Sequence, residues 1–175
     1  MSERYDREPE QAWFPVDYDA PWAAFESRFG FRASTKADGW PAIREPLASV
    51  TFDLSNIPDG PERGASYDCI NAEALRAFVC ALPTSPELVV LDWQHQTYRF
   101  RPAVQAVTWR AEWPVPVYPD GDYFAFFTDD FAEGTFGHPW EQTLSVVGDR
   151  LTASLGKTLA TWLPVKRRGG EPDLG

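Results

Sequence analysis

The sequence predicts an α+β domain, in which a single, mostly antiparallel sheet of about five strands carries about three helices on one face. Apolar residues recur at helical spacing in some segments, and they alternate or cluster over short stretches in between. Most connections between the short stretches are brief, which favours antiparallel pairing of consecutive strands. The chain has 175 residues, a common size for one domain, and we expect that domain to span 13–165.

Three segments have the pattern of amphipathic helices. Asp19, Asn71 and Asp149 can each accept hydrogen bonds from the free N–H groups at the start of a helix. Gly30 and Pro83 favour the ends of the first two helices. Apolar side chains at three- and four-residue steps give each helix one face to bury. The expected helices are 19–29, 71–82 and 149–163.

The strands are expected between these helices. Val50, Phe52 and Leu54 alternate with polar residues, which indicates a strand with one buried face. Pro102 ends a later strand, because proline lacks the N–H group that a sheet ladder needs. The expected strands are 50–54, 88–93, 98–101, 123–127 and 142–147.

The other segments are expected to be irregular. Three prolines predict an extended course for the end of 104–119, and 128–139 is expected to be a turn. Residues 1–12 are polar and 166–175 are rich in glycine and charge, so both are expected to be flexible tails. We find no internal repeat and no linker that would divide the chain.

Charge and hydropathy restrict the classes of function. The 16 Lys and Arg residues against 26 Asp and Glu residues give a formal net charge of −10. Such a chain binds polyanions poorly, so we expect no nucleic acid and no membrane surface as a partner. The charged start has no apolar signal core, and no apolar run reaches the ~18 residues of a membrane span. Cys69 and Cys80 are expected to be buried thiols of a cytoplasmic protein.

The negative charge is concentrated in one stretch. Between residues 111 and 149 there is no Lys or Arg, and eight acidic residues contribute −8 of the net −10. Segregated charge of this kind favours association with a cationic partner. We expect Asp129, Asp130 and Glu133 to belong to a docking face, and the alternative is a solvated acidic surface. The eight are Glu112, Asp120, Asp122, Asp129, Asp130, Glu133, Glu141 and Asp149.

Two short constellations contain the two histidines of the chain. In the first, Asp92 could orient His95 at the end of a strand, so that the imidazole acts as a general acid or base. The alternative is an ordinary turn in which Asp92 accepts hydrogen bonds from the backbone.

In the second constellation, Pro139 restricts the backbone of His138, and Glu141 could place a carboxylate close to the same ring. The acidic residues at 129–133 would raise the pKa of His138 if they approached it. The alternative is a structural corner, in which Trp140 fills the core and His138 bonds to the backbone.

Other residues could bind a ligand. Arg99 and Arg101 could hold an anionic group, and Trp93 and Trp140 could line an aromatic pocket. The chain has no Gly-rich phosphate loop and no paired Cys motif, and its Asp-Gly-Asp run at 120–122 does not continue into a calcium loop. We therefore predict neither a metal nor a cofactor.

Five stretches, which run from about Trp22 to Val165, resemble a family of bacterial domains of unknown function. They are WAAFESRFGFRAS, WPAIREPLASVTFDLS, LDWQHQTYRFRP, WPVPVYPDGDYFAFF and FGHPWEQTLSVVGDRL. The resemblance implies no activity, because the family has no assigned reaction. The module of a strand, residues 148–151 and a helix also loosely resembles small immunity proteins of bacterial toxin systems.

Two functions are compatible with these features, and the sequence does not decide whether the protein is an enzyme. The first is a cytoplasmic binding domain, of the immunity type, that masks a basic partner with an acidic face. The second is a small-molecule enzyme with acid–base chemistry in an aromatic pocket, carried by His138 or His95 with Glu141 or Asp92. Convergence of both histidines on one pocket would favour the enzyme.

Overall fold

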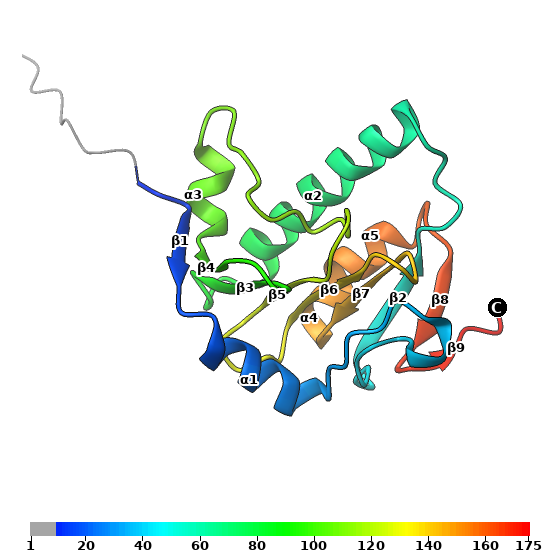
Figure 1. Ribbon diagram of the computed structural model, residues 1–175. Coiled ribbons are helices and arrows are strands. Elements are labelled where there is room, and N and C mark those ends of the chain that lie inside the picture. Colours follow the sequence, from blue (N-terminus) through cyan, green and yellow to red (C-terminus); the bar gives the residue numbers. More distant parts are fainter. Residues whose placement is uncertain (1–9) are drawn as a thin grey trace, which may run out of the picture.

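The computed structural model describes residues 10–175 and places nine strands in one antiparallel sheet (Figure 1). Their order across the sheet is β1-β4-β3-β5-β6-β7-β2-β8-β9. The α+β class with one antiparallel sheet is therefore confirmed, whereas the prediction of about five strands is too low. The bounds are β1 Trp13–Val16, β2 Ser49–Asp53, β3 Leu88–Asp92, β4 Thr97–Phe100, β5 Phe124–Phe127, β6 Gly134–His138, β7 Thr143–Val147, β8 Val165–Arg168 and β9 Glu171–Pro172.

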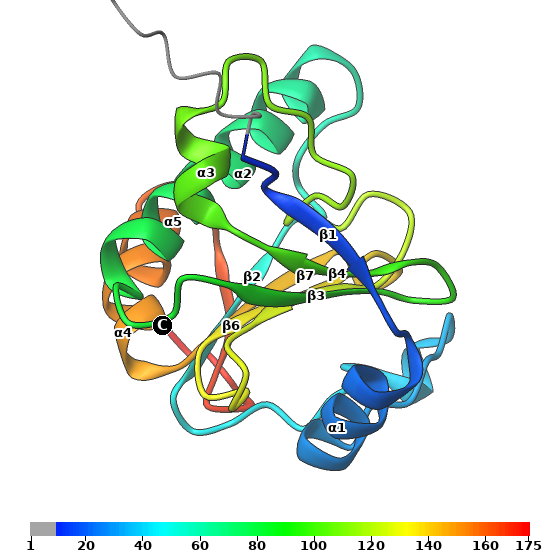
Figure 2. The same cartoon turned by 90° about the vertical axis from the view of Figure 1, so that its left-hand side faces the viewer.

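Helices cover both faces of the sheet, not one face as the sequence suggested (Figure 2). Helix α1 lies on one side, and α2 lies on the other side together with the C-terminal helical run formed by α4, η2 and α5. The bounds are α1 Asp19–Phe29, η1 Ala37–Gly39, α2 Pro61–Ala81, α3 Pro102–Val107, α4 Asp149–Leu151, η2 Thr152–Gly156 and α5 Lys157–Leu159.

The central strands bury both of their faces because side chains alternate between the two sides of a sheet. In β3, Val89 and Leu91 join the core under α1, whereas Leu88 and Val90 join the core under α2. The nearly continuous apolar run of this strand is the pattern expected when both faces are covered. Two hydrophobic cores result, one on each side of the sheet.

Helix α2 begins ten residues earlier than the sequence suggested. Pro61 occupies the first turn, where its missing N–H group costs nothing. Asn71, the expected N-cap, lies buried within the helix instead. Its side-chain oxygen accepts hydrogen bonds from the backbone N–H groups of Val117 and Tyr118, at 2.8 and 3.2 Å. Asn71 therefore fixes the loop that precedes β5.

Four further elements lie where the sequence predicted loops or tails. Helix α3 begins at Pro102 and extends into the segment 104–119, and β6 lies in the expected turn 128–139. β8 and β9 lie in the C-terminal segment that was expected to be flexible. β1 begins just after the expected N-terminal tail, of which residues 1–9 are outside the described residues.

Candidate functional site at the strand ends

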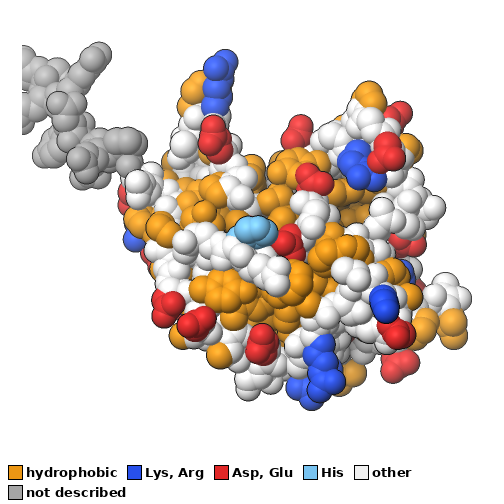
Figure 3. All heavy atoms as spheres, in the orientation of Figure 1, with side chains coloured by type: hydrophobic (Ala, Val, Ile, Leu, Met, Phe, Trp, Pro, Cys, Tyr) orange, Lys and Arg blue, Asp and Glu red, His pale blue; other side chains and the backbone are white. Residues whose placement is uncertain are grey.

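Three turns meet at one end of the central strands. Asp92 at the end of β3 pairs with Phe124 at the start of β5, and Phe124 pairs with Gly137 near the end of β6. Antiparallel pairing therefore brings the turns at these ends together. We call the result the strand-end surface, formed by 92–96, 119–123 and 139–142. Figure 3 shows an exposed histidine near the middle of this face, with acidic and apolar side chains around it.

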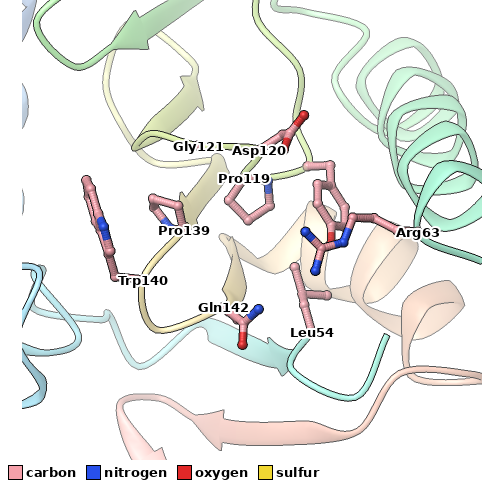
Figure 4. A pocket seen from close by; sticks show the side chains of 9 residues that line it. Leu54, Arg63, Pro119, Asp120, Gly121, Pro139, Trp140 and Gln142 are labelled. Atoms are coloured by element: carbon pink, nitrogen blue, oxygen red, sulfur yellow. The ribbon is translucent and has the colours of Figure 1, made fainter. Parts of the chain in front are cut away.

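The first hollow on this surface has a volume of about 270 Å³ (Figure 4). Arg63 reaches toward it from α2, and Trp140 closes the opposite side, with Pro119 and Pro139 between them. The guanidinium of Arg63 forms an ion pair with Asp59 at 2.6 Å. The hollow is thus lined by aromatic, proline and charged side chains. The full lining is Leu54, Arg63, Tyr118, Pro119, Asp120, Gly121, Pro139, Trp140 and Gln142.

The second hollow, of about 320 Å³, contains the predicted pair of Asp92 and His95. His95 Nδ1 lies 3.0 Å from Asp92 Oδ1 and 3.5 Å from Asp122 Oδ2. The hydrogen bond with Asp92 raises the pKa of His95. Burial in turn raises the pKa of both aspartates. The structure therefore joins the sequence-predicted pair to a third group, Asp122.

The third hollow, of about 330 Å³, lies between the turns and the loop after α1. Trp93 and Trp140 line it with their rings nearly perpendicular, 6.3 Å apart. The Tyr123 hydroxyl donates to Ser34 O at 2.8 Å and accepts from Ser34 N at 2.9 Å. Tyr123 therefore attaches this loop, including Lys36 at the rim, to β5.

His138 lies beneath the strand-end surface and is 1% exposed. Its Nδ1 accepts a hydrogen bond from the backbone N–H of Glu141 at 3.0 Å, and its Nε2 is buried without a hydrogen-bond partner among the described residues. Burial lowers the pKa of His138 to about 4, and Arg167 adds to this effect while Glu141 opposes it. The ring is neutral at pH 7. His138 thus bonds to the backbone, as in the structural corner, whereas Trp140 is only half-buried and lines two of the hollows.

Glu141 is also buried, and it belongs to an ion-pair network. Arg167 of β8 lies between the carboxylates of Glu141 and Glu45, with closest contacts of 2.6 and 2.7 Å. Burial by itself would raise the pKa of Glu141. The hydrogen bonds and the charge of Arg167 outweigh this effect and hold the pKa of Glu141 below its usual value. The carboxylate is therefore occupied by structural contacts.

The other predicted binding residues lie away from this surface. Asp129 follows β5 at the opposite strand end and pairs with Arg99. Arg101 pairs with Glu87 at 2.7 Å and stacks over the Phe14 ring. These two arginines are thus engaged by other carboxylates and do not line the three hollows.

The acidic stretch does not form one continuous face. Asp130 accepts hydrogen bonds from the side chain of Thr128 and the backbone N–H of Ala132. Glu133 accepts from the first backbone N–H groups of the C-terminal helical run, those of Arg150 and Leu151. These carboxylates thus stabilise a turn and a helix end.

The hypothesis of an enzyme based on both histidines gains no support from this arrangement. His95 lines the second hollow, whereas His138 lines none of the three hollows. Arg63 and Lys36 also line these hollows, and no local pattern points to them because both lie on segments remote from the turns.

A family model described as a protein of unknown function, DUF2716, matches residues 15–152, which include the whole strand-end surface. The chain belongs to the DUF2716 family. No solved structure matches it significantly. Helix length and hydropathy give no candidate for a membrane-crossing helix within residues 10–175.

One relative of this DUF2716 chain is the uncharacterized protein YxiI of Bacillus subtilis strain 168. The two are 39% identical over 88 residues, which is 49% of this chain and 54% of YxiI. The match thus spans about half the length of the relative. Both comparisons support the predicted bacterial family of unknown function.

Proposed function

We propose that this DUF2716 chain is a binding domain whose strand-end surface receives a Lys or Arg side chain of a partner protein. The proposal rests on the observation that the three hollows adjoin one another: Trp140 lines the first and third, and Asp120 lines the first and second. An exposed carboxylate and a partly exposed indole thus border the same surface. This combination attracts a cation through charge and through the face of the aromatic ring.

The shape of the surface supports a protein partner. The hollows are separate depressions of about 270 to 330 Å³ that are joined along their rims. Trp93 and Trp140 are rigid aromatic side chains of the kind that supply most of the binding energy at protein interfaces. Polar and charged residues such as Lys36 and Asp120 surround them, as in the rim of an interface.

Charge supports a basic partner. The chain has a net charge of −10, which would speed the approach of a cationic protein and make association sensitive to salt. An immunity-type role, in which the domain masks a basic toxin, is one form of this function. Cys69 and Cys80 are both free and exposed, contrary to the expected burial. Free surface thiols support the proposed cytoplasmic location, where thiols stay reduced.

A peptide library displayed on phage tests the proposal without a known partner. We expect the selected peptides to be enriched in Lys and Arg, and their affinity to fall as the salt concentration rises. Trp140→Ala and Asp120→Asn should each weaken binding at least tenfold. The matched controls Trp109→Ala and Asp129→Asn change an exposed tryptophan and an exposed aspartate away from the strand-end surface, and they should bind normally.

Two results would contradict the proposal. The first is selection of peptides without basic residues. The second is binding that responds to the Asp129 or Trp109 variants but not to those at Asp120 and Trp140.

A further inference from the structure

Three metal-ligating groups converge in the second hollow. Asp92, His95 and Asp122 each offer one ligand atom, and these atoms all lie within 4.8 Å of one another. Asp92 is the last residue of β3 and His95 lies in the turn that follows, whereas Asp122 precedes β5. The convergence therefore depends on the pairing of β3 with β5.

We propose that Asp92, His95 and Asp122 form a binding site for a divalent transition metal ion of the zinc type. The ion would take the place of the proton shared between His95 Nδ1 and Asp92 Oδ1. The site lies on the strand-end surface, but the inference does not depend on the binding of a partner protein.

The distances fit such an ion. Bonds from zinc to imidazole nitrogen or carboxylate oxygen are about 2.0–2.2 Å long, so neighbouring ligand atoms lie about 2.8 Å apart in an octahedron and up to about 3.6 Å apart in a tetrahedron. His95 Nδ1 lies 3.0 Å from Asp92 Oδ1 and 3.5 Å from Asp122 Oδ2. Both separations fall inside this range. An ion can therefore bridge His95 to either aspartate, and the ligand atoms of the two aspartates lie within 4.8 Å of each other.

The ligands are also held in place before any ion binds. The backbone N–H of His95 donates to Asp92 O at 3.1 Å, which closes the turn that carries the imidazole. Asp122 Oδ1 accepts from the backbone N–H of Tyr123 at 2.8 Å, so its other oxygen, Oδ2, faces His95. Prior ordering of this kind lowers the entropy cost of binding.

The electrostatic environment favours a cation. The side chains of Asp92 and Asp122 are only 17% and 18% exposed, and His95 is the one group paired with them among the described ion pairs. No Lys or Arg lines this hollow, and Asp120 adds a third carboxylate at its rim. A dication would offset the cost of holding two carboxylates in a partly buried place.

The ligand set indicates the class of metal. One imidazole and two carboxylates suit zinc, manganese or iron, whereas calcium prefers six to eight oxygen ligands. His95 is 62% exposed, so the ion would face solvent and keep at least one coordination position open.

Calorimetric titration of the untagged, chelator-treated chain with zinc chloride at neutral pH tests the site. We expect one equivalent of zinc to bind, and cobalt to give visible absorption bands at the same stoichiometry. His95→Ala and Asp122→Asn should each weaken zinc binding at least tenfold. Asp129→Asn, which changes an exposed aspartate outside this hollow, is the control and should change the affinity less than threefold.

Two outcomes would overturn the inference. One is the absence of saturable binding. The other is binding that persists in His95→Ala and Asp122→Asn but is lost in Cys69→Ser/Cys80→Ser, because the exposed thiols would then be the ligands. Far-ultraviolet circular dichroism of each variant shows that it is folded. No partner protein is present, so a failure here leaves the proposed function untouched.

Discussion

Arg167 donates two hydrogen bonds to the Glu141 carboxylate, from Nη1 to Oε1 over 2.6 Å and from Nη2 to Oε2 over 3.0 Å. The same guanidinium donates to Glu45, whose side chain is 1% exposed. Thr51 and Ser145 complete the cluster by hydrogen bonding to Glu45 Oε1. One arginine on β8 thus ties the β6–β7 turn, the segment before β2 and two central strands together.

Arg167→Met should destabilise the domain by about 3–5 kcal/mol, because it leaves two buried carboxylates without their counter-charge. The matched control is Arg168→Met, since Arg168 is the next residue on β8 and its side chain is 60% exposed. Its loss should change the free energy of unfolding by no more than about 0.5 kcal/mol. Urea denaturation measures both, and equal effects of the two substitutions would contradict the assigned role.

Glu133→Ala should lower the free energy of unfolding by about 1–2 kcal/mol, which is the usual effect of removing a helix cap. Its two carboxylate oxygens each accept a hydrogen bond at 3.0 Å, from the backbone N–H groups of Arg150 and Leu151. The negative charge also suits the N-terminal end of a helix. Glu133→Gln keeps one acceptor oxygen and should recover part of the loss. Thermal unfolding distinguishes these variants, and an unchanged stability of Glu133→Ala would assign Glu133 to the solvated surface instead.

Stability should fall as the pH decreases from about 6.5 to about 4, because of His138. Its pKa is about 4 in the folded protein and near 6.5 when unfolded, so the unfolded chain binds more protons in this window. The free energy of unfolding that is present above pH 6.5 and lost by about pH 4 is about 3 kcal/mol. Urea denaturation across this pH range should show the slope in the wild type and a much smaller slope in His138→Gln.

A second loss of stability is expected at lower pH, where the lowered pKa of Glu141 takes effect. The ionised Glu141 stabilises the folded protein above pH 4.5, the ordinary pKa of a glutamate, and this stabilisation is lost as the pH falls below 4.5. This loss should remain in His138→Gln. A wild-type stability that is flat between pH 7 and pH 5 would contradict the burial of a neutral His138.

Tyr123→Phe should release the loop around Ser34 while leaving the sheet intact. The Tyr123 hydroxyl makes two hydrogen bonds to the backbone of Ser34, and their loss should cost about 1–3 kcal/mol. Hydrogen exchange should become faster at the Ser34 amide and stay slow at β5 and β6. Equal acceleration in both regions would show a global effect and contradict this local role.

Local patterns predicted several elements well. The α1 stripe of Trp22, Phe25 and Phe29 is buried as its spacing indicates. The strands at 50–54 and 88–93 also appear close to their expected bounds. In each case the residues that define the element lie within a few positions of one another, so the pattern is visible in the chain itself.

β6 was missed because two of the five residues in its sequence, Gly-Thr-Phe-Gly-His, are glycines, which are depleted in strands. Gly134 is needed for packing, since a Cβ there would collide with the carbonyl oxygen of Phe126 and the ring of Phe127. β8 was missed because of a charged residue. Its Arg167 looks like a solvated charge in the sequence, and only its two buried partners make the strand part of the core.

The candidate site was predicted in part. Trp93, His95, Asp92 and Trp140 do lie on one surface, as residues at strand ends can. Asp122 could not be joined to His95, because 27 positions separate them in the sequence. Glu141 and His138 were candidates for acid–base chemistry, but the pairing of Glu141 with Arg167 and the packing of His138 against Trp40 depend on remote segments.

The sequence by itself determined the α+β class, the acidic character and the local helices and strands, because periodicity and charge are properties of neighbouring residues. The tertiary structure decided where that charge acts. It divided the acidic stretch among a buried ion pair, a helix cap, a turn and the strand-end surface. A carboxylate acquires its role from burial and from its partner, and both are set by the pairing of distant strands.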